Sequence, residues 1–358
     1  MKRVGHLYAQ ITDIHNLALA HRHAKRGKGW YKEVLAIDAN PEPYLTKLQT
    51  QLLTRTYQTS EYFTFTKREG KKERLIYKLP YYPDRVCQWA IIQVIEPYLL
   101  KYMTDDTYSA LPGRGIHSCL AKVQKAMRKD PEETKYCLKI DARKFYPSIN
   151  HAILKACYRR LFKDADLLWL LDEIIDSTPG ETGIPIGNYL SQYSGNLYLA
   201  RFDHYVKEVL QIKYYYRYMD DMVFFGSSKQ ALHSLKQAVE RYLAEELKLQ
   251  LKDNWQVFPT QVRGVDFVGY RIFKDYTLLR KSTALNFKKR MREIAKKVKQ
   301  GQPLSDSDYA SIQAYRGWLN HCNSYRLTRK YLTPLTAAIA AYETKKSQKR
   351  GGLHDRAR

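Results

Sequence analysis

Hydrophobic and polar residues follow two different periods along this chain, and each period predicts one kind of element. Between Glu61 and Pro80, apolar and polar residues alternate around Gly70, which predicts a β-hairpin. Residues 85–99 instead carry apolar side chains at helical spacing and predict a helix. The segment before Gln58 is mixed, and we expect helices there with a break at ANPEPYL.

The middle of the chain combines strand and helix patterns in an order that predicts an α+β fold. Strand-like alternation over residues 135–149 is followed by a Gly-rich turn and a helix within 183–202. A second strand region at 214–226 precedes another helix, and 263–273 is strand-like again. The apolar positions in register on that helix are Leu232, Leu235, Val239, Leu243 and Leu247. This order predicts a split βαβ sheet with helices on one face.

Charge and composition narrow the class of partner. The chain has 61 Lys and Arg residues against 36 Asp and Glu residues, a formal net charge of +25. A surplus of this size predicts a nucleic-acid partner, whereas a merely soluble basic protein would fit a smaller one. The five cysteines are far apart and lack C-x-x-C spacing, so we expect neither a disulfide framework nor a zinc site. No apolar run approaches about 18 residues and no signal peptide is recognisable, which predicts a cytoplasmic protein without a membrane partner.

Two adjacent carboxylates lie within the apolar stretch YYYRYMDDMVFFG, residues 214–226. Strand formers flank Asp220 and Asp221, so we expect a tight turn between two paired strands at this point. Met219-Asp220 is a poor turn sequence, which favours strain retained for function. Adjacent carboxylates repel each other unless a cation neutralises them, and Mg²⁺ binds through one or two carboxylates. The alternative is a solvated acidic hairpin tip.

A third acid, Asp141, lies on the polar face of its predicted strand and is followed by an aromatic pair. Asp141, Asp220 and Asp221 together predict a catalytic site with two Mg²⁺ ions, for which Mn²⁺ is a candidate substitute. In such a site one ion activates a 3′-hydroxyl and the other stabilises the leaving pyrophosphate. The three acids and the positive charge together favour this interpretation over the solvated hairpin tip.

The tetrapeptide Tyr218-Met219-Asp220-Asp221 resembles the signature of reverse transcriptases, and the resemblance covers most of the chain in the right order. It extends to KKERLIYKLPYYPDRVCQWA, TYSALPGRGIHSCL, IDARKFYPSI, GIPIGNYLSQ and RGVDFVGYRIF. The resemblance implies RNA-templated DNA synthesis from dNTPs, with template RNA and a cDNA/RNA hybrid as partners. It also implies an α+β right-hand polymerase with fingers, a ferredoxin-like palm and a short helical thumb. The implied domains are an N-terminal helical segment 1–58, fingers 59–136 interleaved with the palm, palm 137–278, thumb 279–345 and a basic disordered tail 346–358.

The matched motifs assign roles to further residues. For the incoming nucleotide they imply Lys72 and Arg74 near the triphosphate, Tyr146 as a steric gate against a ribose 2′-OH, and Gln192 beneath the nascent base pair. For the template strand and fidelity they imply Arg85, Arg114, Ile184, Ile186 and Ser191. Lys252 is a candidate general acid that donates a proton to pyrophosphate. Other roles stay open: a core tyrosine for Tyr146, a cap of a helix starting around Tyr193 for Gln192, and a solvated charge for Lys252.

The block GIPIGNYLSQ ends in Ser191-Gln192, where retroviral and group II intron enzymes usually carry Gln-Gly followed shortly by Ser-Pro. This form, together with YRYMDDMVFFG and LLRKS, resembles the reverse transcriptases of diversity-generating retroelements. That resemblance implies a template-repeat RNA, an oligomeric small basic accessory variability protein, cDNA miscopied at template adenines, and a bacterial or phage-infected cell. Three rival functions stay open: an antiviral reverse transcriptase of the abortive-infection kind, a group II intron-type reverse transcriptase or maturase, and an inactive polymerase-like RNA-binding module.

Overall fold

In the computed structural model, which describes residues 2–69 and 72–354, the chain groups into two units. Unit 1 comprises Met1–Gly115, Leu138–Phe224 and Gln230–Val257, and unit 2 comprises Ile116–Cys137, Phe225–Lys229 and Phe258–Arg358. The chain passes between the units several times, so neither unit is one continuous segment. Among the described residues, no helix combines the length and the apolar character needed to cross a membrane.

A five-stranded sheet runs in the order β3-β5-β6-β4-β7. Its strands are β3 (Thr107–Tyr108), β4 (Tyr136–Asp141), β5 (Tyr215–Tyr218), β6 (Asp221–Gly226) and β7 (Gln256–Pro259). Strands β5 and β6 pair antiparallel, and β3 runs parallel to β5. Aromatic and β-branched residues are frequent in these segments and favour strands. The predicted order of strand, helix, strand pair and helix is confirmed in this sheet. The predicted last strand, 263–273, is wrong as a member of it: β7 takes that place, and 263–273 lies in a separate three-stranded sheet. Strand β3 adds an edge strand that the sequence pattern did not predict.

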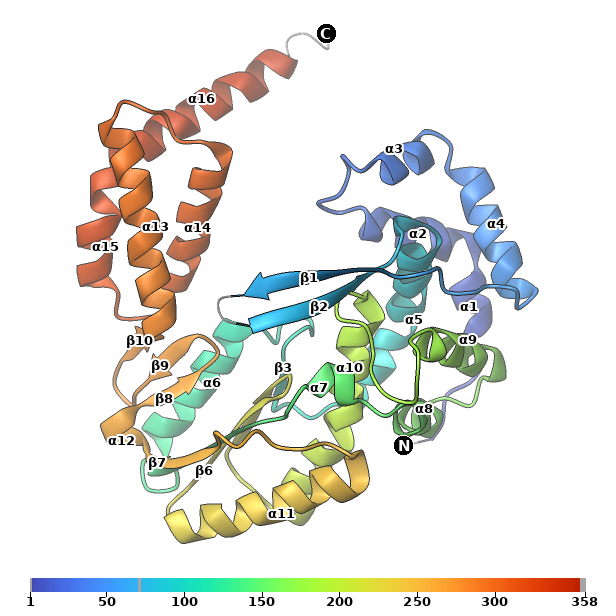
Figure 1. Ribbon diagram of the computed structural model, residues 1–358, viewed down its shortest axis with the longest axis horizontal. Coiled ribbons are helices and arrows are strands. Elements are labelled where there is room, and N and C mark those ends of the chain that lie inside the picture. Colours follow the sequence, from blue (N-terminus) through green and yellow to red (C-terminus); the bar gives the residue numbers. More distant parts are fainter. Residues whose placement is uncertain (1, 70–71, 355–358) are drawn as a thin grey trace. The chain divides into compact units, whose positions relative to one another are not determined.

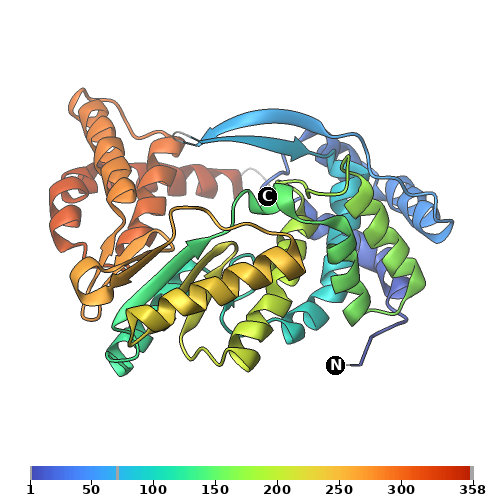
Figure 2. The same ribbon diagram turned by 60° about the horizontal axis from the view of Figure 1, so that its bottom comes forward.

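Two helices, α10 (Tyr189–His204) and α11 (Lys229–Leu247), pack beside each other. Tyr198 of α10 donates a hydrogen bond of 2.7 Å to the carbonyl of Leu247, and the rings of Phe202 and Tyr242 have centroids 5.7 Å apart. In Figure 2, α11 (yellow) runs along one face of the sheet. Its buried residues are the five apolar positions from Leu232 to Leu247 that the periodicity predicts.

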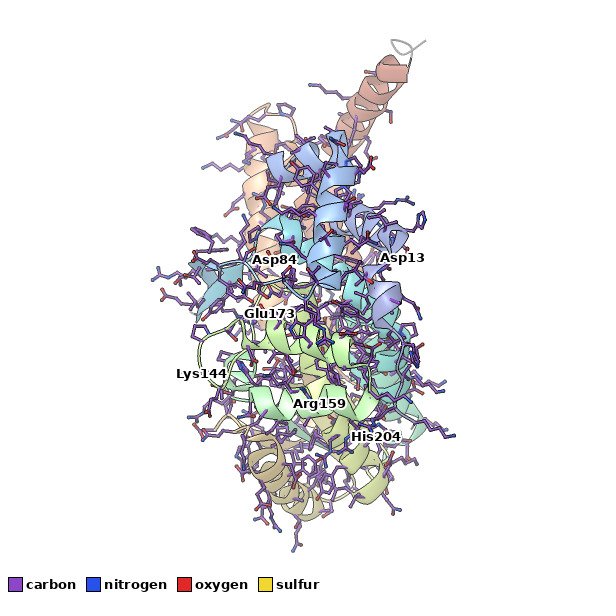
Figure 3. The ribbon with its side chains drawn as sticks, turned by 90° about the vertical axis from the view of Figure 1, so that its right-hand side faces the viewer. Asp13, Asp84, Lys144, Arg159, Glu173 and His204 are labelled. Carbon is purple, nitrogen blue, oxygen red and sulfur yellow. The ribbon has the colours of Figure 1, made fainter. Side chains whose placement is uncertain are left out.

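The N-terminal segment forms four helices, α1 (Tyr8–Thr12), α2 (Ile14–Ala24), α3 (Lys32–Ala39) and α4 (Pro41–Leu53). The break expected at ANPEPYL is confirmed, because α3 ends at Ala39 and α4 begins at Pro41. Proline is favoured at the first position of a helix, since the N–H group that it lacks has no acceptor within the helix there. Asp13, labelled in Figure 3, caps α2 by accepting hydrogen bonds from the N–H groups of His15 and Asn16. The predicted helix over 85–99 is α5 (Val86–Tyr102), which packs against α2.

The predicted hairpin is confirmed as β1 (Phe63–Glu69) and β2 (Lys72–Lys78), which pair antiparallel from Phe63 opposite Lys78. Figure 1 shows the two strands as a ribbon of their own, apart from the five-stranded sheet. The turn expected at Gly70 lies outside the described residues.

Acidic side chains fix the chain at the base of this hairpin. Asp84, in the short helical turn η1 (Tyr81–Arg85), accepts a hydrogen bond of 3.0 Å from the N–H of Ser60. Glu173 accepts one of 2.9 Å from the N–H of Thr59, and Figure 3 labels both acids. Unit 1 also contains α7 (Phe145–Ser148), α8 (His151–Leu161), α9 (Ala165–Asp176) and the turn η2 (Tyr205–Val209).

Unit 2 combines a three-stranded sheet in the order β10-β9-β8 with several helices. These elements are α6 (Ile116–Lys129), α12 (Thr260–Arg263), β8 (Val265–Phe267), β9 (Tyr270–Ile272), β10 (Thr277–Leu279), α13 (Lys281–Lys299), α14 (Asp306–Leu319), α15 (Tyr325–Tyr331), η3 (Thr333–Leu335) and α16 (Thr336–His354). Helix α13 confirms the helical, basic region expected from Arg280. Helix α6 falls within the segment 59–136 expected as fingers, yet it groups with unit 2, where Arg128 donates a 2.9 Å hydrogen bond to the carbonyl of Lys274.

Two segments differ from the expectations. The strand-like stretch 263–273 is a hairpin of two short strands, because Val268 and Gly269 both have positive φ, +43° and +86°. A Cβ at position 269 would lie 2.3 Å from the ring of Trp318, so only glycine permits this approach. Helix α16 continues through residues 346–354, which we expected to be a disordered tail, although Gly351 and Gly352 disfavour helix. Residues 355–358 lie outside the described part.

Candidate active site

The Met219-Asp220 turn is the centre of the candidate site. Tyr218 pairs with Asp221 across β5 and β6, which leaves Met219 and Asp220 as a two-residue turn and confirms the tight turn expected there. Met219 has a φ of +55°, a left-handed conformation that is uncommon for a residue with a side chain other than Asn or Asp. The strain that the turn sequence favours is therefore present in the backbone.

Strand β4 places Asp141 next to this turn. The strand lies beside β6 in the sheet, and Asp141 is its last residue. The N–H of Ala142 donates a hydrogen bond of 3.3 Å to the carbonyl of Asp220, and the N–H of Lys252 donates one of 2.9 Å to the carbonyl of Asp141. Backbone hydrogen bonds thus connect segments around residues 141, 220 and 252, and they bring Asp141 close to Asp220.

The carboxyl groups of Asp220 and Asp141 interact directly. Burial, the charge of Asp141 and a hydrogen bond between the two carboxyl groups together raise the pKa of Asp220 to about 6. Two carboxylates that share a poorly hydrated space cannot both carry an uncompensated charge at low cost. Asp220 therefore retains its proton to a higher pH than an ordinary aspartate does.

Two lysines provide the opposing charge. Lys252 Nζ lies 2.5 Å from Asp141 Oδ1, and Lys139 Nζ lies 3.1 Å from Asp221 Oδ2. All four side chains are half-buried, so the charges are only partly screened by water. Within residues 2–69 and 72–354, no group of three His, Cys, Asp or Glu side chains is arranged to hold a metal ion. The structure thus brings Asp141 and Asp220 together and pairs Asp221 with Lys139.

Tyr146, the predicted steric gate, lies beside the same turn. Helix α7 follows Lys144, which has a left-handed φ of +46° and is labelled in Figure 3. The hydroxyl of Tyr146 donates to Met219 Sδ at 3.7 Å, and burial together with the charge of Asp220 raises the pKa of Tyr146 to about 12. A Cβ at Gly195 would lie 3.2 Å from the ring of Phe145 and 3.6 Å from that of Tyr146, so glycine leaves room for both rings.

The Gly-rich loop before α10 connects this tyrosine to the hairpin. The N–H of Ile184 donates a 3.1 Å hydrogen bond to the carbonyl of Tyr146, and the N–H of Tyr77 donates one of 3.3 Å to the carbonyl of Ile186. Gly187 has a φ of +126°, and a Cβ there would lie 2.8 Å from the carbonyl oxygen of Tyr77. Ile184 is buried and Ile186 half-buried, so both predicted fidelity residues belong to one loop held between α7 and β2.

Ser191 and Gln192 both lie in the first turn of α10. The helix begins at Tyr189 with Asn188 at the N-cap position, so the alternative role of Gln192 as a cap is wrong. The sequence pattern misplaced the helix start because Asn188, rather than the later polar pair, terminates the Gly-rich loop. Ser191 is buried and Gln192 is exposed, which leaves the Gln192 amide accessible to a ligand.

The predicted cationic residues occupy separate places in unit 1. Arg74 is exposed on β2, and Lys72 begins that strand, although its side chain lies outside the described part. Arg114 donates hydrogen bonds to the carbonyl of Thr104 and to Asp105 Oδ1, at 2.7 and 3.0 Å.

Arg85 lines a cavity of about 240 Å³ within unit 1. Lys28, Lys78, Tyr31 and Tyr189 also line it, as does Gly187 of the Gly-rich loop. Burial lowers the pKa of Arg85, and burial together with the charge of Arg85 lowers the pKa of Lys28. Three cations, Arg85, Lys28 and Lys78, outnumber the one acid that lines the cavity, Glu33, and this balance suits an anionic ligand.

Sequence reasoning missed Lys139 and Arg217. Lys139 shares a strand face with Asp141, and alternation placed it there, but its pairing with Asp221 depends on the neighbouring strand. Arg217 was visible as a charged residue inside a run of strand-forming aromatics. Its complete burial is the signal that such a residue has a fixed partner.

A family model described as reverse transcriptase (RNA-dependent DNA polymerase) matches residues 66–272, which include all three acids. The protein YkfC of Escherichia coli (strain K12) is 24% identical over 271 residues, which cover 63% of this chain and 70% of YkfC.

Two solved telomerases are similar in structure. Telomerase from Candida albicans, in complex with a TWJ fragment of telomeric RNA, has a TM-score of 0.51 at 10% identity and covers 87% of this chain and 59% of its own. Apo telomerase from Candida tropicalis has a TM-score of 0.48 at 12% identity, covering 82% and 65%. The chain thus spans 59 to 65% of these telomerase chains, and the first likeness shows the expected α+β right-hand polymerase fold. Because the family model covers more than half of the residues, the chain belongs to the reverse transcriptases, the family of RNA-dependent DNA polymerases.

Proposed function

We propose that this chain is an RNA-templated DNA polymerase that makes adenine-mutagenised cDNA from a template-repeat RNA for a diversity-generating retroelement. The observation that carries the polymerase activity is the carboxyl pair of Asp141 and Asp220 at a strained turn, with Asp221 beside it and Tyr146 against it. Membership of the reverse transcriptase family supports the same reaction.

The acids suit divalent cations, and we propose that Asp141, Asp220 and Asp221 hold two Mg²⁺ ions, with Mn²⁺ as a substitute. The hydrogen bond between the carboxyl groups of Asp141 and Asp220 requires a proton, whose place a cation would take. When bound, the ions supply the charge that activates the 3′-hydroxyl of the primer and neutralises the leaving pyrophosphate.

The protein's own groups position the substrates and handle a proton. Lys252, whose ammonium group lies 2.5 Å from Asp141, is the proposed donor of a proton to pyrophosphate. Tyr146 presents its ring beside the turn, where a ribose 2′-OH would collide with it. Lys72 and Arg74 on the hairpin bind the triphosphate, and Gln192 lies beneath the nascent base pair.

RNA is the proposed template, and the charge of the whole chain supports it. The net charge of +25 suits a polyphosphate strand, and the telomerase of Candida albicans was solved with telomeric RNA. Arg85 in its cationic and aromatic cavity, Arg114, and the loop of Ile184 and Ile186 are the proposed template contacts.

The retroelement role rests on the form of the block beneath the template, which ends in Ser191-Gln192. In a site that contacts the nascent base pair loosely, a mismatch costs the least binding free energy opposite template adenine, because adenine pairs by only two hydrogen bonds. A loose pocket lowers fidelity by slowing correct addition, so the polymerase is slow even with correct dNTPs. The proposed partner is a small basic oligomeric accessory protein, in the cytoplasm of a bacterial or phage-infected cell.

Sequencing of cDNA tests this proposal. The purified protein, with and without its accessory protein, copies a defined RNA that contains all four bases in matched contexts. Misincorporation is expected to concentrate at template adenines, and Ile186→Val is expected to change the adenine error relative to the other bases. Errors spread evenly over the four bases would leave a reverse transcriptase and remove the retroelement role. Failure to copy RNA at all would remove the polymerase.

A further inference from the structure

A fully buried ion pair lies directly behind the Met219-Asp220 turn. Arg217 of β5 and Asp203 of α10 both have completely buried side chains. Arg217 Nε donates to Asp203 Oδ1 at 2.7 Å, and Nη2 donates to Asp203 Oδ2 at 2.5 Å. This two-point contact fixes the plane of the guanidinium group, which a single contact would not do.

The remaining nitrogen of Arg217 points to the turn. Its Nη1 donates to the carbonyl oxygen of Met219 and to Asn196 Oδ1, both at 3.1 Å. The Met219 carbonyl belongs to the peptide that joins Met219 to Asp220. A hydrogen bond at this oxygen therefore restrains the orientation of that peptide group. The residue that contributes the carbonyl, Met219, is the one with the left-handed φ of +55°.

The surrounding groups hold the ion pair in place from several elements. Tyr215 donates its hydroxyl to Asp203 Oδ1 at 2.8 Å, and Thr107 of β3 donates to Asp203 Oδ2 at 2.9 Å. Asn196 of α10 is itself anchored, because its Nδ2 donates to the carbonyl of Ser109 at 2.9 Å. Such a satisfied network is rigid, and it transmits the position of α10 to the turn.

Stability alone does not account for this arrangement. A buried ion pair can often be replaced by apolar residues of similar size without loss of stability, because removing two charges from water is costly. What the Arg217 network does that an apolar core would not is to restrain the Met219-Asp220 peptide group, next to an acid of the site.

We propose that Arg217 is a positioning residue for the reaction: through the Met219 carbonyl it holds the turn in the left-handed conformation that presents Asp220 to Asp141. The inference rests on the proposed function, since it names what orients that site. Arg217 touches no reacting atom and acts only through the turn.

The main test compares two variants of the full-length protein. Arg217→Lys keeps a positive charge toward Asp203 and loses the planar fork that reaches Met219. Tyr215→Phe is the matched control, because it removes one hydrogen bond to Asp203 and leaves the bond to Met219 in place. Primer extension on RNA gives kcat and the KM for dNTP, at a temperature at which thermal unfolding shows both variants folded.

For Arg217→Lys we expect kcat to fall about 10- to 100-fold, as for supporting residues around metal ligands, with the KM for dNTP and RNA affinity little changed. Tyr215→Phe should retain kcat even where its melting temperature falls as far. Equal kcat losses in the two variants at equal loss of stability would overturn the inference.

Two further measurements keep the inference testable. Mn²⁺ titrated into the protein without RNA or dNTP, followed by electron paramagnetic resonance, should bind more weakly to Arg217→Lys than to Tyr215→Phe. This readout decides the inference even if the wild-type protein makes no DNA, which would contradict only the proposed function. If Arg217→Lys does not fold, Asn196→Ala removes the acceptor that orients Nη1 and leaves the ion pair intact. Wild-type Mn²⁺ affinity in Asn196→Ala would then overturn the inference.

Discussion

Asp220 has two properties that are expected of a carboxyl group in a shielded cation site and are uncommon elsewhere in folded proteins: a second acid close by and a raised pKa. Its side chain is half-buried beside a second acid, and its pKa is raised to about 6. The same burial that excludes water from the site makes the ionised carboxylate unfavourable while no divalent cation is bound. Function at this residue should therefore be measurable as a cost to stability.

That cost leads to a prediction for Asp220→Asn. Folding raises the pKa of Asp220 from an ordinary value of about 3.9 to about 6, so the folded state binds the proton more tightly. The contribution of this residue to stability is full below about pH 4 and is lost as the pH rises through about 6. Without divalent cations, Asp220→Asn should be more stable than wild type at pH 7.5 by roughly 1–3 kcal/mol.

Urea unfolding at a series of pH values measures this difference. The advantage of Asp220→Asn should shrink as the pH falls from 7 toward 4. Asp253→Asn, whose carboxylate is exposed, serves as the control and should show no such trend. A destabilised Asp220→Asn at pH 7.5, or an advantage independent of pH, would contradict the raised pKa.

Tyr146 gives a second prediction at the same scale. Its ring packs beside the turn, and its hydroxyl makes only a 3.7 Å contact with sulfur. A steric gate works through volume, so Tyr146→Ala should raise incorporation of ribonucleotides relative to deoxyribonucleotides by about tenfold or more, or roughly 1.4 kcal/mol. Tyr146→Phe, which keeps the ring, is the matched control and should change the ratio little. Competition between rNTPs and dNTPs in primer extension measures it, and an unchanged ratio in Tyr146→Ala would place the gate elsewhere.

Among the elements, the Gly-rich loop 183–188 connects the hairpin to the candidate site. Gly187 and Gly180 both have positive φ, +126° and +90°, but only Gly187 approaches another backbone, the carbonyl of Tyr77. Gly187→Ala and Gly180→Ala should share the cost of backbone strain, and only Gly187→Ala should displace the loop from β2. We expect DNA synthesis to fall about tenfold more in Gly187→Ala than in Gly180→Ala. Equal losses in primer extension would show that the loop–hairpin contact is unimportant.

The elements also show which information the sequence carries. The five apolar positions of α11 and the hairpin at residues 61–80 could be predicted, because each is a local period of side chains. The pairing of Asp221 with Lys139 could not, since it joins residues 82 positions apart through the register of two strands. The left-handed turn at Val268 could not either, because valine is not a turn residue and its φ is imposed by the surrounding structure. Motif spacing thus placed the acids near one another, and tertiary contacts decided their partners.

At the scale of the whole molecule, we expect RNA binding and catalysis to depend on different residues. The net charge of +25 attracts RNA by a force that salt screens, whereas the proposed chemistry depends on three acids. A substitution at one acid should leave the attraction for RNA almost unchanged.

Primer extension by Asp220→Asn, with RNA binding measured on the same preparation, tests the central claim most directly. The substitution keeps the size of the side chain and removes the charge that neutralises a cation. We predict that DNA synthesis on RNA falls by more than about 100-fold, while RNA affinity and its decline with salt match those of the wild type. Asp253→Asn, with its exposed carboxylate, should retain both activities. DNA synthesis at the wild-type rate in Asp220→Asn would contradict the assignment of this site.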